Sequence, residues 1–468
     1  MTLQERRQRY VNKNREKVRN SQRDNYQRTR LQRNARRREL QKGRRDTGDK
    51  ENANPVEDAS DQTQPTSISA SDATQNQLPN PQQSSHSFLF VPLDKINEIG
   101  GLRSLAIPAS KDSAKSLPYF DIELIDSLVD RFGDGFAARG ETPVLHQGVL
   151  LMEVMKFCYK QEVIYMNVDE LTRTCRQYGA RHMSLGLRPL VIFLYQTTYS
   201  MDWVWLNRLF DELTALPHDK PLRTYPCRTE LVWEARKLGD IQVLDDIARL
   251  AKHKRFQYRP ITCSGSGRCA LAEHSKTVQK RSSSCGSRHV KINSCRTSSL
   301  HCEIEGKLPA TKQPTISTAV YFHQEFVDTF DSIGEFRVFL VCERCGQGLR
   351  NRRAKIIHTI RTKFEDDDII AYNVTATESS YHELHEFALY IMSCLRDRYD
   401  WEEKFESLEV GVRLDIAISN DERFFVNEIT RWYAADWFSL STLGPPHTQL
   451  CSSFATALDA YFSYRNAS

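Results

Sequence analysis

The pattern of apolar and polar positions divides the chain into a polar N-terminal quarter and a long segment with the periodicity of folded structure. Residues 1–46 contain almost no apolar side chains, and residues 47–117 are rich in Ser, Gln, Asn, Asp and Pro. Such segments cannot bury a core of their own. The pattern therefore predicts a basic, helix-prone tail over 1–46 and a disordered linker over 47–117. Within the linker, only the apolar island 88–96 is expected to dock on folded structure.

From about Pro118 onward, apolar residues recur with the periods of helices and strands. Helical spacing appears in FDIELIDSLVDRF, VLLMEVMKFCYK and DWVWLNRLFDELTAL, whereas residues 190–194 form a continuous apolar run typical of a buried strand. Residues 118–260 are therefore predicted to be helix-rich α/β structure.

Extended patterns dominate after residue 260. They include SKTVQKR, RHVKIN, TAVYFHQEFV, EFRVFLVC and AKIIHTIRT. A strongly amphipathic helix follows in SYHELHEFALYIMSCLRDRYD, and then two strands around a tight turn in RLDIAISNDERFFVNEITRWY. The helix QLCSSFATALDAYFSY closes the chain. The predicted fold class is α/β, with a long disordered basic N-terminal region.

Charge is distributed unevenly between the tail and the remainder of the chain. Residues 1–45 carry 17 Lys and Arg against 4 Asp and Glu, a net charge of about +13, whereas the whole chain has +5. The tail has three open interpretations: nonspecific binding to nucleic acid, a nuclear import signal, or a solvated tail without a partner. No leucine zipper follows it, which argues against sequence-specific readout by a dimer.

The cysteines and the lack of long apolar runs indicate an intracellular protein, cytoplasmic or nuclear. No run of 18 apolar residues exists, and the N-terminus lacks the apolar region of a secretory signal. Twelve cysteines are scattered along the chain. Cys342 and Cys345 have the spacing of half a zinc site, but no other cysteine pair does. We therefore interpret them as ordinary reduced cysteines.

Acidic and amide residues interrupt the two apolar strands near the C-terminus. Asp415 lies on the first strand, and Asn427 and Glu428 lie on the second. Paired carboxylates from neighbouring strands are oxygen ligands suited to Mg²⁺ that stays bound to phosphate. A buried carboxylate also needs a nearby cation. The alternative interpretation is therefore a salt bridge from Asp415 or Glu428 to Arg413 or Arg431.

Three further features have both a functional and a purely structural interpretation. Lys280 ends a strand before a Ser-rich loop containing Gly286, which would suit an anion or be a mobile turn. Gln324 and Glu325 interrupt an apolar strand. This pattern is typical either of a hinge that contacts an adenine base or of an edge strand with one face in solvent. Arg337 alternates into a strand, where it would clamp phosphate or lie on the surface.

Taken in order along the chain, these features resemble the ATP-grasp superfamily. The resemblance covers residues 226–468, and residues 118–225 would form the α/β domain that precedes the ATP-grasp domain in such enzymes. It implies a two-lobed fold and a ligase that uses Mg²⁺ and ATP to activate a carboxylate as an acyl phosphate. An amine-like nucleophile would then attack the acyl phosphate. The substrate would be a small-molecule or peptide carboxylate, and no membrane would be involved.

The resemblance also implies roles for individual residues. Those implied to bind the nucleotide are Lys280, Ser282, Ser283, Ser284, Gly286, Ser287, Gln324, Glu325, Phe326 and Val327. Those implied to hold Mg²⁺ are Asp415, Asn427, Glu428 and Thr430. Charge on the transferred phosphoryl group would be neutralised by Lys280 and Arg337. The acceptor substrate would be faced by His358, Arg361, Arg431 and Tyr433.

The sequence departs from the family pattern at three places. The stretch from Asn293 to Pro314, between the Ser-rich loop and the predicted hinge, is polar, contains Cys295 and Cys302, and is longer than the family pattern leads us to expect. The family usually has Asn two residues after the Glu, where this chain has Thr430, and Asn427 precedes Glu428 instead. An early lysine that contacts phosphate in the family is either missing, near residues 239–241, or supplied by Lys237. An alternative function therefore stays open: a degenerate protein that binds nucleotide without turnover, or is not catalytic, and whose basic arm binds nucleic acid.

Overall fold

The computed structural model divides into two units, Met1–Gln77 and Leu78–Ser468. The predicted basic tail lies outside the residues that the structure describes, all of which belong to the second unit. The described residues are 87–93, 106–108, 122–133, 136–139, 144–178, 190–195, 203–215, 222–232, 236–263, 271, 274–282, 290–293, 304–305, 319–344, 352–365, 368–374, 381–398, 403–435 and 446–465.

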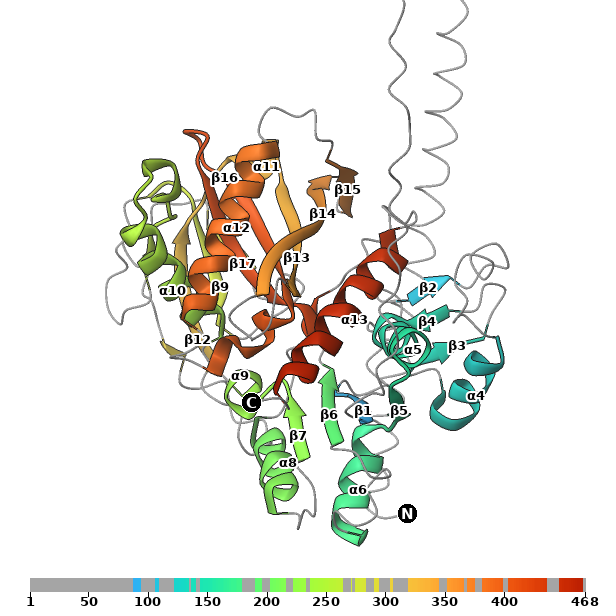
Figure 1. The fold of residues 1–468 in the computed structure, drawn as a ribbon. Coiled ribbons are helices and arrows are strands. Elements are labelled where there is room, and N and C mark those ends of the chain that lie inside the picture. Colours follow the sequence, from blue (N-terminus) through green and yellow to red (C-terminus); the bar gives the residue numbers. More distant parts are fainter. Residues whose placement is uncertain are drawn as a thin grey trace, which may run out of the picture. The chain divides into compact units, whose positions relative to one another are not determined.

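The N-terminal part of this unit is built on a four-stranded parallel sheet (Figure 1). Across the sheet the strands are β5 (Glu162–Tyr165), β1 (Ser87–Pro92), β6 (Leu190–Tyr195) and β7 (Leu222–Tyr225). The larger helices here are α4 (Ile122–Phe132), α5 (Gln147–Tyr159), α6 (Val168–Tyr178) and α8 (Trp203–Ala215). A small sheet has the order β2 (Ala106–Pro108), β4 (Val144–His146) and β3 (Ala137–Ala138).

Strand β1 revises the predicted linker. It pairs with both β5 and β6, and its side chains from Ser87 to Pro92 are buried. The apolar island therefore supplies an inner strand of the sheet, and the predicted linker 47–117 contains part of the core. Parallel strands are covered on both faces, which explains why the run is apolar without alternation. Polar sequence on both sides of so short a run hid its importance.

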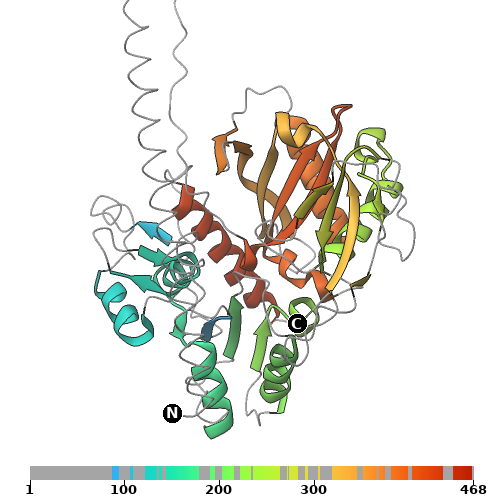
Figure 2. The ribbon, with the colours of Figure 1, turned by 180° about the vertical axis from the view of Figure 1, so that it is seen from behind.

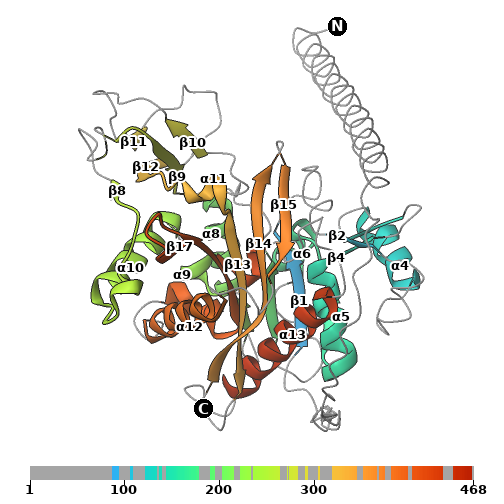
Figure 3. The ribbon, with the colours of Figure 1, turned by 90° about the horizontal axis from the view of Figure 1, so that it is seen from above.

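Two antiparallel sheets form the C-terminal part, and Figure 3 shows their labelled strands together. One sheet has the order β10 (Val290–Asn293), β9 (Thr277–Arg281), β12 (Ala319–Glu325) and β11 (Ile304–Glu305), with β8 (Thr262–Cys263) also paired to β12. The other, called here the main sheet, has the order β15 (Asp368–Asn373), β14 (Arg352–Glu365), β13 (Glu335–Arg344), β16 (Gly411–Ile418) and β17 (Phe424–Arg431).

The remaining elements are helices. They are α9 (Arg228–Leu231), α10 (Arg236–Leu250), α11 (Thr329–Ser332), α12 (Tyr381–Asp397), α13 (Pro446–Arg465) and the 3₁₀ helices η2 (Lys254–Phe256), η4 (Glu403–Glu409) and η5 (Trp432–Ala434). No helix in the described part of the chain is long and apolar enough to cross a membrane. The predicted α/β class is confirmed.

Alternation along β13 directs its side chains to different hydrophobic cores on the two faces of the main sheet. Figures 1 and 2 show the ribbon of this sheet from opposite sides. Phe336 and Val338 pack in a core with residues of α12, such as Phe387. Phe339 belongs to the core that contains β1, β6 and α13, with Phe454 among its members. Fully burying a side chain of this size contributes roughly 1.5–3 kcal/mol. The face of the main sheet that carries Phe339 also bears the polar residues of the candidate site, such as Arg337, nearer the start of β13.

The position of β1 predicts where the chain can be shortened. A protein that begins at residue 78 keeps β1 and should unfold cooperatively, whereas one that begins at residue 118 loses an inner strand with Phe88 and Phe90, both fully buried. Loss of these two side chains alone removes several kcal/mol, on the scale of the whole stability of a domain. Circular dichroism and thermal melting would compare the two proteins. A cooperative melt for the shorter protein at the same temperature would contradict this role of β1.

Candidate functional site

Three of the predicted functional residues lie in one row across the main sheet. Arg337 on β13 is the partner of Asp415 on β16, and Asp415 is the partner of Glu428 on β17. Directly opposed residues of antiparallel strands point to the same face, with Cβ atoms about 5 Å apart. The separation of thirteen residues between the two carboxylates therefore brings them side by side across a tight turn.

A β-bulge adds Asn427 to this row. The register between β16 and β17 passes from Asp415 opposite Glu428 to Ile416 opposite Val426, so Asn427 is the extra residue. Val426 and Ile429 both pack in the core on the α12 face, although they are three residues apart. The bulge thus allows the neighbouring residues Asn427 and Glu428 to serve the same polar face.

Lys280 reaches this bulge from strand β9 of the other antiparallel sheet. Its Nζ donates to Oδ1 of Asn427 at 2.8 Å and to Oε1 of Gln324 at 2.8 Å. The amide Nδ2 of Asn427 donates in turn to Oε1 of Glu335 at 2.7 Å. Gln324 Nε2 donates to Thr262 Oγ1 at 3.1 Å. A continuous set of hydrogen bonds therefore joins the predicted phosphate lysine on one sheet to the predicted metal residues on the other.

Both carboxylates of the row are paired with cations. The Arg413 guanidinium donates from Nε and Nη2 to the two oxygens of buried Asp415, each at 2.7 Å, and from Nη2 to Thr430 Oγ1 at 3.2 Å. Lys237 Nζ lies 3.3 Å from Oε1 of Glu428. The salt-bridge alternative is thus observed for Asp415, with Arg413 as its partner. Lys237 stands where the sequence left open a second phosphate lysine.

Burial and neighbouring charges of the same sign shift two pKa values in the site. Burial, and then the nearby Lys237, lower the pKa of Lys280 to about 8. Burial, and then the nearby Asp415, raise the pKa of Glu335 to about 7. The Nε of Arg337 is buried without a hydrogen-bond partner. A polyanion that bound here could accept hydrogen bonds from several cationic side chains. These side chains now donate to carboxylates or amides, or have a donor without a partner.

The donor set fits a Mg²⁺ ion carried by phosphate better than a metal site made by protein alone. Within the described residues, no three His, Cys, Asp or Glu side chains are grouped to hold a metal. Mg²⁺ is often held by one or two carboxylates together with substrate phosphates and water. Asp415 and Glu428, opposite one another in the ladder, can supply that pair.

The predicted hinge, residues 324–327, lies beside an apolar row of the β16–β17 hairpin. Val327 packs in a small core with Ala417 and Phe425, which are partners across β16 and β17. Ala417 lies two residues beyond Asp415, so the apolar row is next to the polar row. The backbone N–H of Glu325 donates to Ile261 C=O at 2.9 Å. Apolar surface thus adjoins the charged residues at the predicted hinge.

Other predicted nucleotide residues are placed as follows. Phe326 lies under the Lys276 ammonium, which is 3.5 Å from the ring centroid. Ser282 is buried, and its carbonyl accepts a 3.2 Å hydrogen bond from Lys237 N–H. The remaining loop positions lie outside the described residues; they are Ser283, Ser284, Gly286 and Ser287.

The four predicted acceptor-facing residues are not brought together. His358 is the partner of Phe339 and shares the face of Arg337, whereas Arg361 is the partner of Phe336 and points to the opposite face. Burial lowers the pKa of His358. Arg361 instead stacks over a tyrosine ring, 5.4 Å from its centroid.

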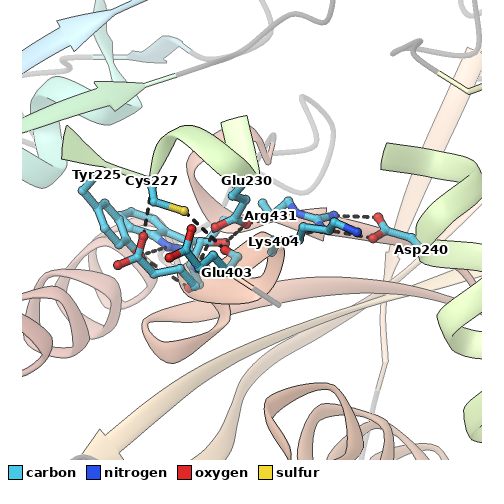
Figure 4. Close-up of polar contacts among 10 residues, drawn as sticks. Tyr225, Cys227, Glu230, Asp240, Glu403, Lys404 and Arg431 are labelled. Carbon is cyan, nitrogen blue, oxygen red and sulfur yellow. Dashed lines mark hydrogen bonds and ion pairs between the residues drawn. The ribbon is translucent and has the colours of Figure 1, made fainter. Parts of the chain in front are cut away.

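Arg431 and Tyr433 are both buried, and their predicted contact with an acceptor substrate stays a prediction. Arg431 is fully enclosed, and its guanidinium donates to Glu230 at 3.0 Å and to Asp240 at 2.6 and 3.0 Å (Figure 4). Tyr433 is also fully buried. Sequence adjacency to Glu428 suggested a substrate role, but alternation and the end of the strand send Arg431 inward.

Sequence reasoning missed two residues that support the site. Glu335 holds the Asn427 amide, and its alternation with Arg337 in GEFRVF was a readable signal. Arg259 donates to the carbonyl of Val426, immediately before the bulge, and to Asp245 Oδ1 at 2.9 Å. Arg259 gave no signal, because it lies in a short segment 167 residues earlier in the chain. The possible zinc half-site has no support: Cys342 is buried and free, and Cys345 lies outside the described residues.

Comparison with known proteins yields distant structural matches. No protein family model and no curated protein matches the chain. Among solved structures, D-cycloserine synthetase DcsG is 12% identical with a TM-score of 0.39, over 80% of this chain and 99% of that chain. D-alanyl-alanine synthetase A from Vibrio cholerae O1 biovar eltor is 7% identical with a TM-score of 0.38, over 80% and 99%.

A third match is the ATP-grasp ligase PsnB, solved with a precursor variant, Mg and ADP. It is 12% identical with a TM-score of 0.34, over 80% of this chain and 99% of that chain. Identities and TM-scores at this level describe a loose similarity of arrangement. The functional assignment therefore depends on the residues of the site itself.

The raised pKa of Glu335 predicts a pH-dependent stability. Its folded-state pKa of about 7 lies above the ordinary value of 4.5, so the folded protein binds the proton more tightly than the unfolded chain does. The stabilisation is complete below pH 4.5 and is lost as the pH rises through 7, with a maximum loss of about 3 kcal/mol. Glu335→Gln keeps an oxygen acceptor for Asn427 but cannot ionise.

Urea unfolding of the wild type and Glu335→Gln at several pH values would test this. The stability of the wild type should fall relative to that of the variant between pH 4.5 and pH 7.5. A difference between the two proteins that does not change with pH would show that Glu335 titrates normally.

Proposed function

We propose that this protein binds Mg²⁺ and ATP at the polar row and acts as an ATP-dependent ligase that activates a carboxylate. One observation carries the proposal. Lys280 on strand β9 contacts Asn427, the extra residue of the bulge, beside the opposed carboxylates Asp415 and Glu428. The phosphate lysine and the metal ligands implied by the sequence come from segments 147 residues apart, yet they meet.

Cationic side chains would perform the binding of phosphate. Lys280, Lys237 and Arg413 are held by an amide or by carboxylates in this structure, and each would turn to phosphate oxygens when a triphosphate enters. Arg337, with a buried unsatisfied Nε, would donate to the phosphoryl group being transferred. Donors already in place need little reorganisation as charge develops.

Metal and base would occupy neighbouring parts of the same face. Mg²⁺ held by Asp415 and Glu428 would neutralise charge on the phosphates and align them for in-line transfer. The base would lie toward the hinge, where Val327 packs against Ala417 and Phe425. The reaction needs no nucleophilic side chain. The substrate carboxylate would attack the γ-phosphorus and displace ADP, and an amine-like acceptor would then attack the acyl carbon and displace inorganic phosphate. A small molecule or peptide would provide the acid.

Nucleotide binding provides the direct test. Calorimetric titration of the full-length protein with ADP and AMP-PNP should show micromolar binding that requires Mg²⁺. Lys280→Ala should weaken binding by roughly 10- to 100-fold, because a charged hydrogen bond contributes about 1.5–3 kcal/mol. The Asp415→Asn/Glu428→Gln variant should lose the dependence on Mg²⁺.

Two matched variants control for general effects of charge removal. Lys291→Ala removes an exposed lysine from strand β10, next to the strand of Lys280. Glu343→Gln removes a surface carboxylate from the main sheet, where it pairs with Lys355. Both should bind nucleotide like the wild type. Absence of binding by folded wild-type protein, or equal affinities for Lys280→Ala and Lys291→Ala, would refute the nucleotide site.

We also propose that the basic arm, residues 1–46, binds nucleic acid without sequence preference. The concentration of positive charge in residues 1–45, about +13, favours this, since binding would release counterions from the phosphate backbone. Full-length protein should bind a duplex in 50 mM salt and lose about 10³-fold or more in affinity at 200 mM salt. Protein beginning at residue 78 should not bind. Equal binding by both proteins would exclude the arm as the site.

A further inference from the structure

The first turn of α10 makes two ion pairs with strand β17. Lys237 lies 3.3 Å from Glu428, and Asp240, one helical turn later, receives two hydrogen bonds from Arg431. Residues three apart on a helix share a face. One side of the helix therefore presents the Lys237 ammonium to Glu428 and the Asp240 carboxylate to Arg431.

These two contacts lie on opposite faces of the strand. Glu428 and Arg431 are three residues apart on β17, so alternation directs them to opposite faces. β17 is an edge strand, with only β16 beside it in the order of the main sheet. The first turn of α10 thus holds the edge strand from both sides.

The two contacts differ in burial. Arg431 and Glu230 have no exposed side-chain surface, and Asp240 is 6% exposed. Glu230 also accepts hydrogen bonds from Ser407 N–H at 2.9 Å and Ser407 Oγ at 2.6 Å. Breaking such a buried pair leaves a charge without compensation. Lys237 and Glu428, by comparison, keep 16% and 26% of their side-chain surface exposed.

We infer that Asp240 is a positioning residue for nucleotide binding, acting through Lys237. This inference rests on the proposed function. The buried Asp240–Arg431 pair anchors the first turn of α10 to the strand that bears Glu428. When a nucleotide phosphate binds the ammonium of Lys237 and Mg²⁺ binds Glu428, the Lys237–Glu428 pair separates. The buried Asp240–Arg431 pair then keeps the helix in place, so that Lys237 approaches phosphate without reordering its backbone.

A double-mutant cycle on ADP affinity tests this, using full-length protein with Mg²⁺. Asp240→Asn keeps the size of the side chain but gives up the charge and the two-fold acceptance from Arg431. In the wild-type background we expect Asp240→Asn to weaken ADP binding about fivefold or more. In the Lys237→Ala background it should change ADP affinity by less than about twofold. A purely structural role would weaken binding equally in both backgrounds.

Glu409→Gln is the matched control. Glu409 accepts two hydrogen bonds from Arg396, at 2.9 and 3.0 Å, in another largely buried pair, with side chains 9% and 15% exposed. It should lower the melting temperature as Asp240→Asn does and leave ADP affinity unchanged. If Asp240→Asn does not fold, Asp240→Glu, which retains the charge but displaces the carboxylate, takes its place in the cycle.

The outcomes separate the two proposals. Binding by the wild type with equal effects of Asp240→Asn in both backgrounds overturns the positioning role and leaves the nucleotide site intact. Wild-type affinity in Asp240→Asn overturns it as well. Failure of the folded wild type to bind ADP overturns the proposed function, and the positioning role with it.

Discussion

The bulge at Asn427 is the constraint on which the site depends. Without an extra residue, strict alternation would place Asn427 and Glu428 on opposite faces, and Val426 or Ile429 would leave the α12 core. One inserted residue lets the strand keep its apolar residues inside and present an amide and a carboxylate together. Arg259, which donates to the Val426 carbonyl, satisfies a backbone group beside the bulge and so helps to retain it.

The charges around the bulge explain why the site suits an anionic ligand. Burial, and then the nearby Lys237, lower the pKa of Lys280, whereas burial, and then the nearby Asp415, raise the pKa of Glu335. Groups that each disfavour the charged form of a neighbour are poor contributors to stability and are typical of functional sites. A phosphate chain would relieve the repulsion between the lysines, and a divalent cation would relieve that between the carboxylates.

Three residues that the sequence singled out lie close together in the structure, whereas one strand of the core was missed. Lys280, Asp415 and Glu428 were readable because each is a charged residue on an apolar strand, and local alternation is visible without knowing the fold. Strand β1 was assigned to a linker because its six residues acquire meaning only from pairing with β5 and β6, far along the chain. The ion pairs of Arg431 were unreadable for a similar reason, since Glu230 and Asp240 come from two other helices.

One departure from the ATP-grasp pattern has a physical counterpart in this geometry. The amide that the family usually places two residues after the glutamate stands one residue before it, and the bulge returns it to the same face. Thr430, at the usual position, supplies a hydroxyl that contacts Arg413 and, at 3.4 Å, Asp415. The Asn427 oxygen accepts a hydrogen bond from Lys280. The change in sequence therefore places the amide beside that lysine, on the face that also carries Asp415 and Glu428.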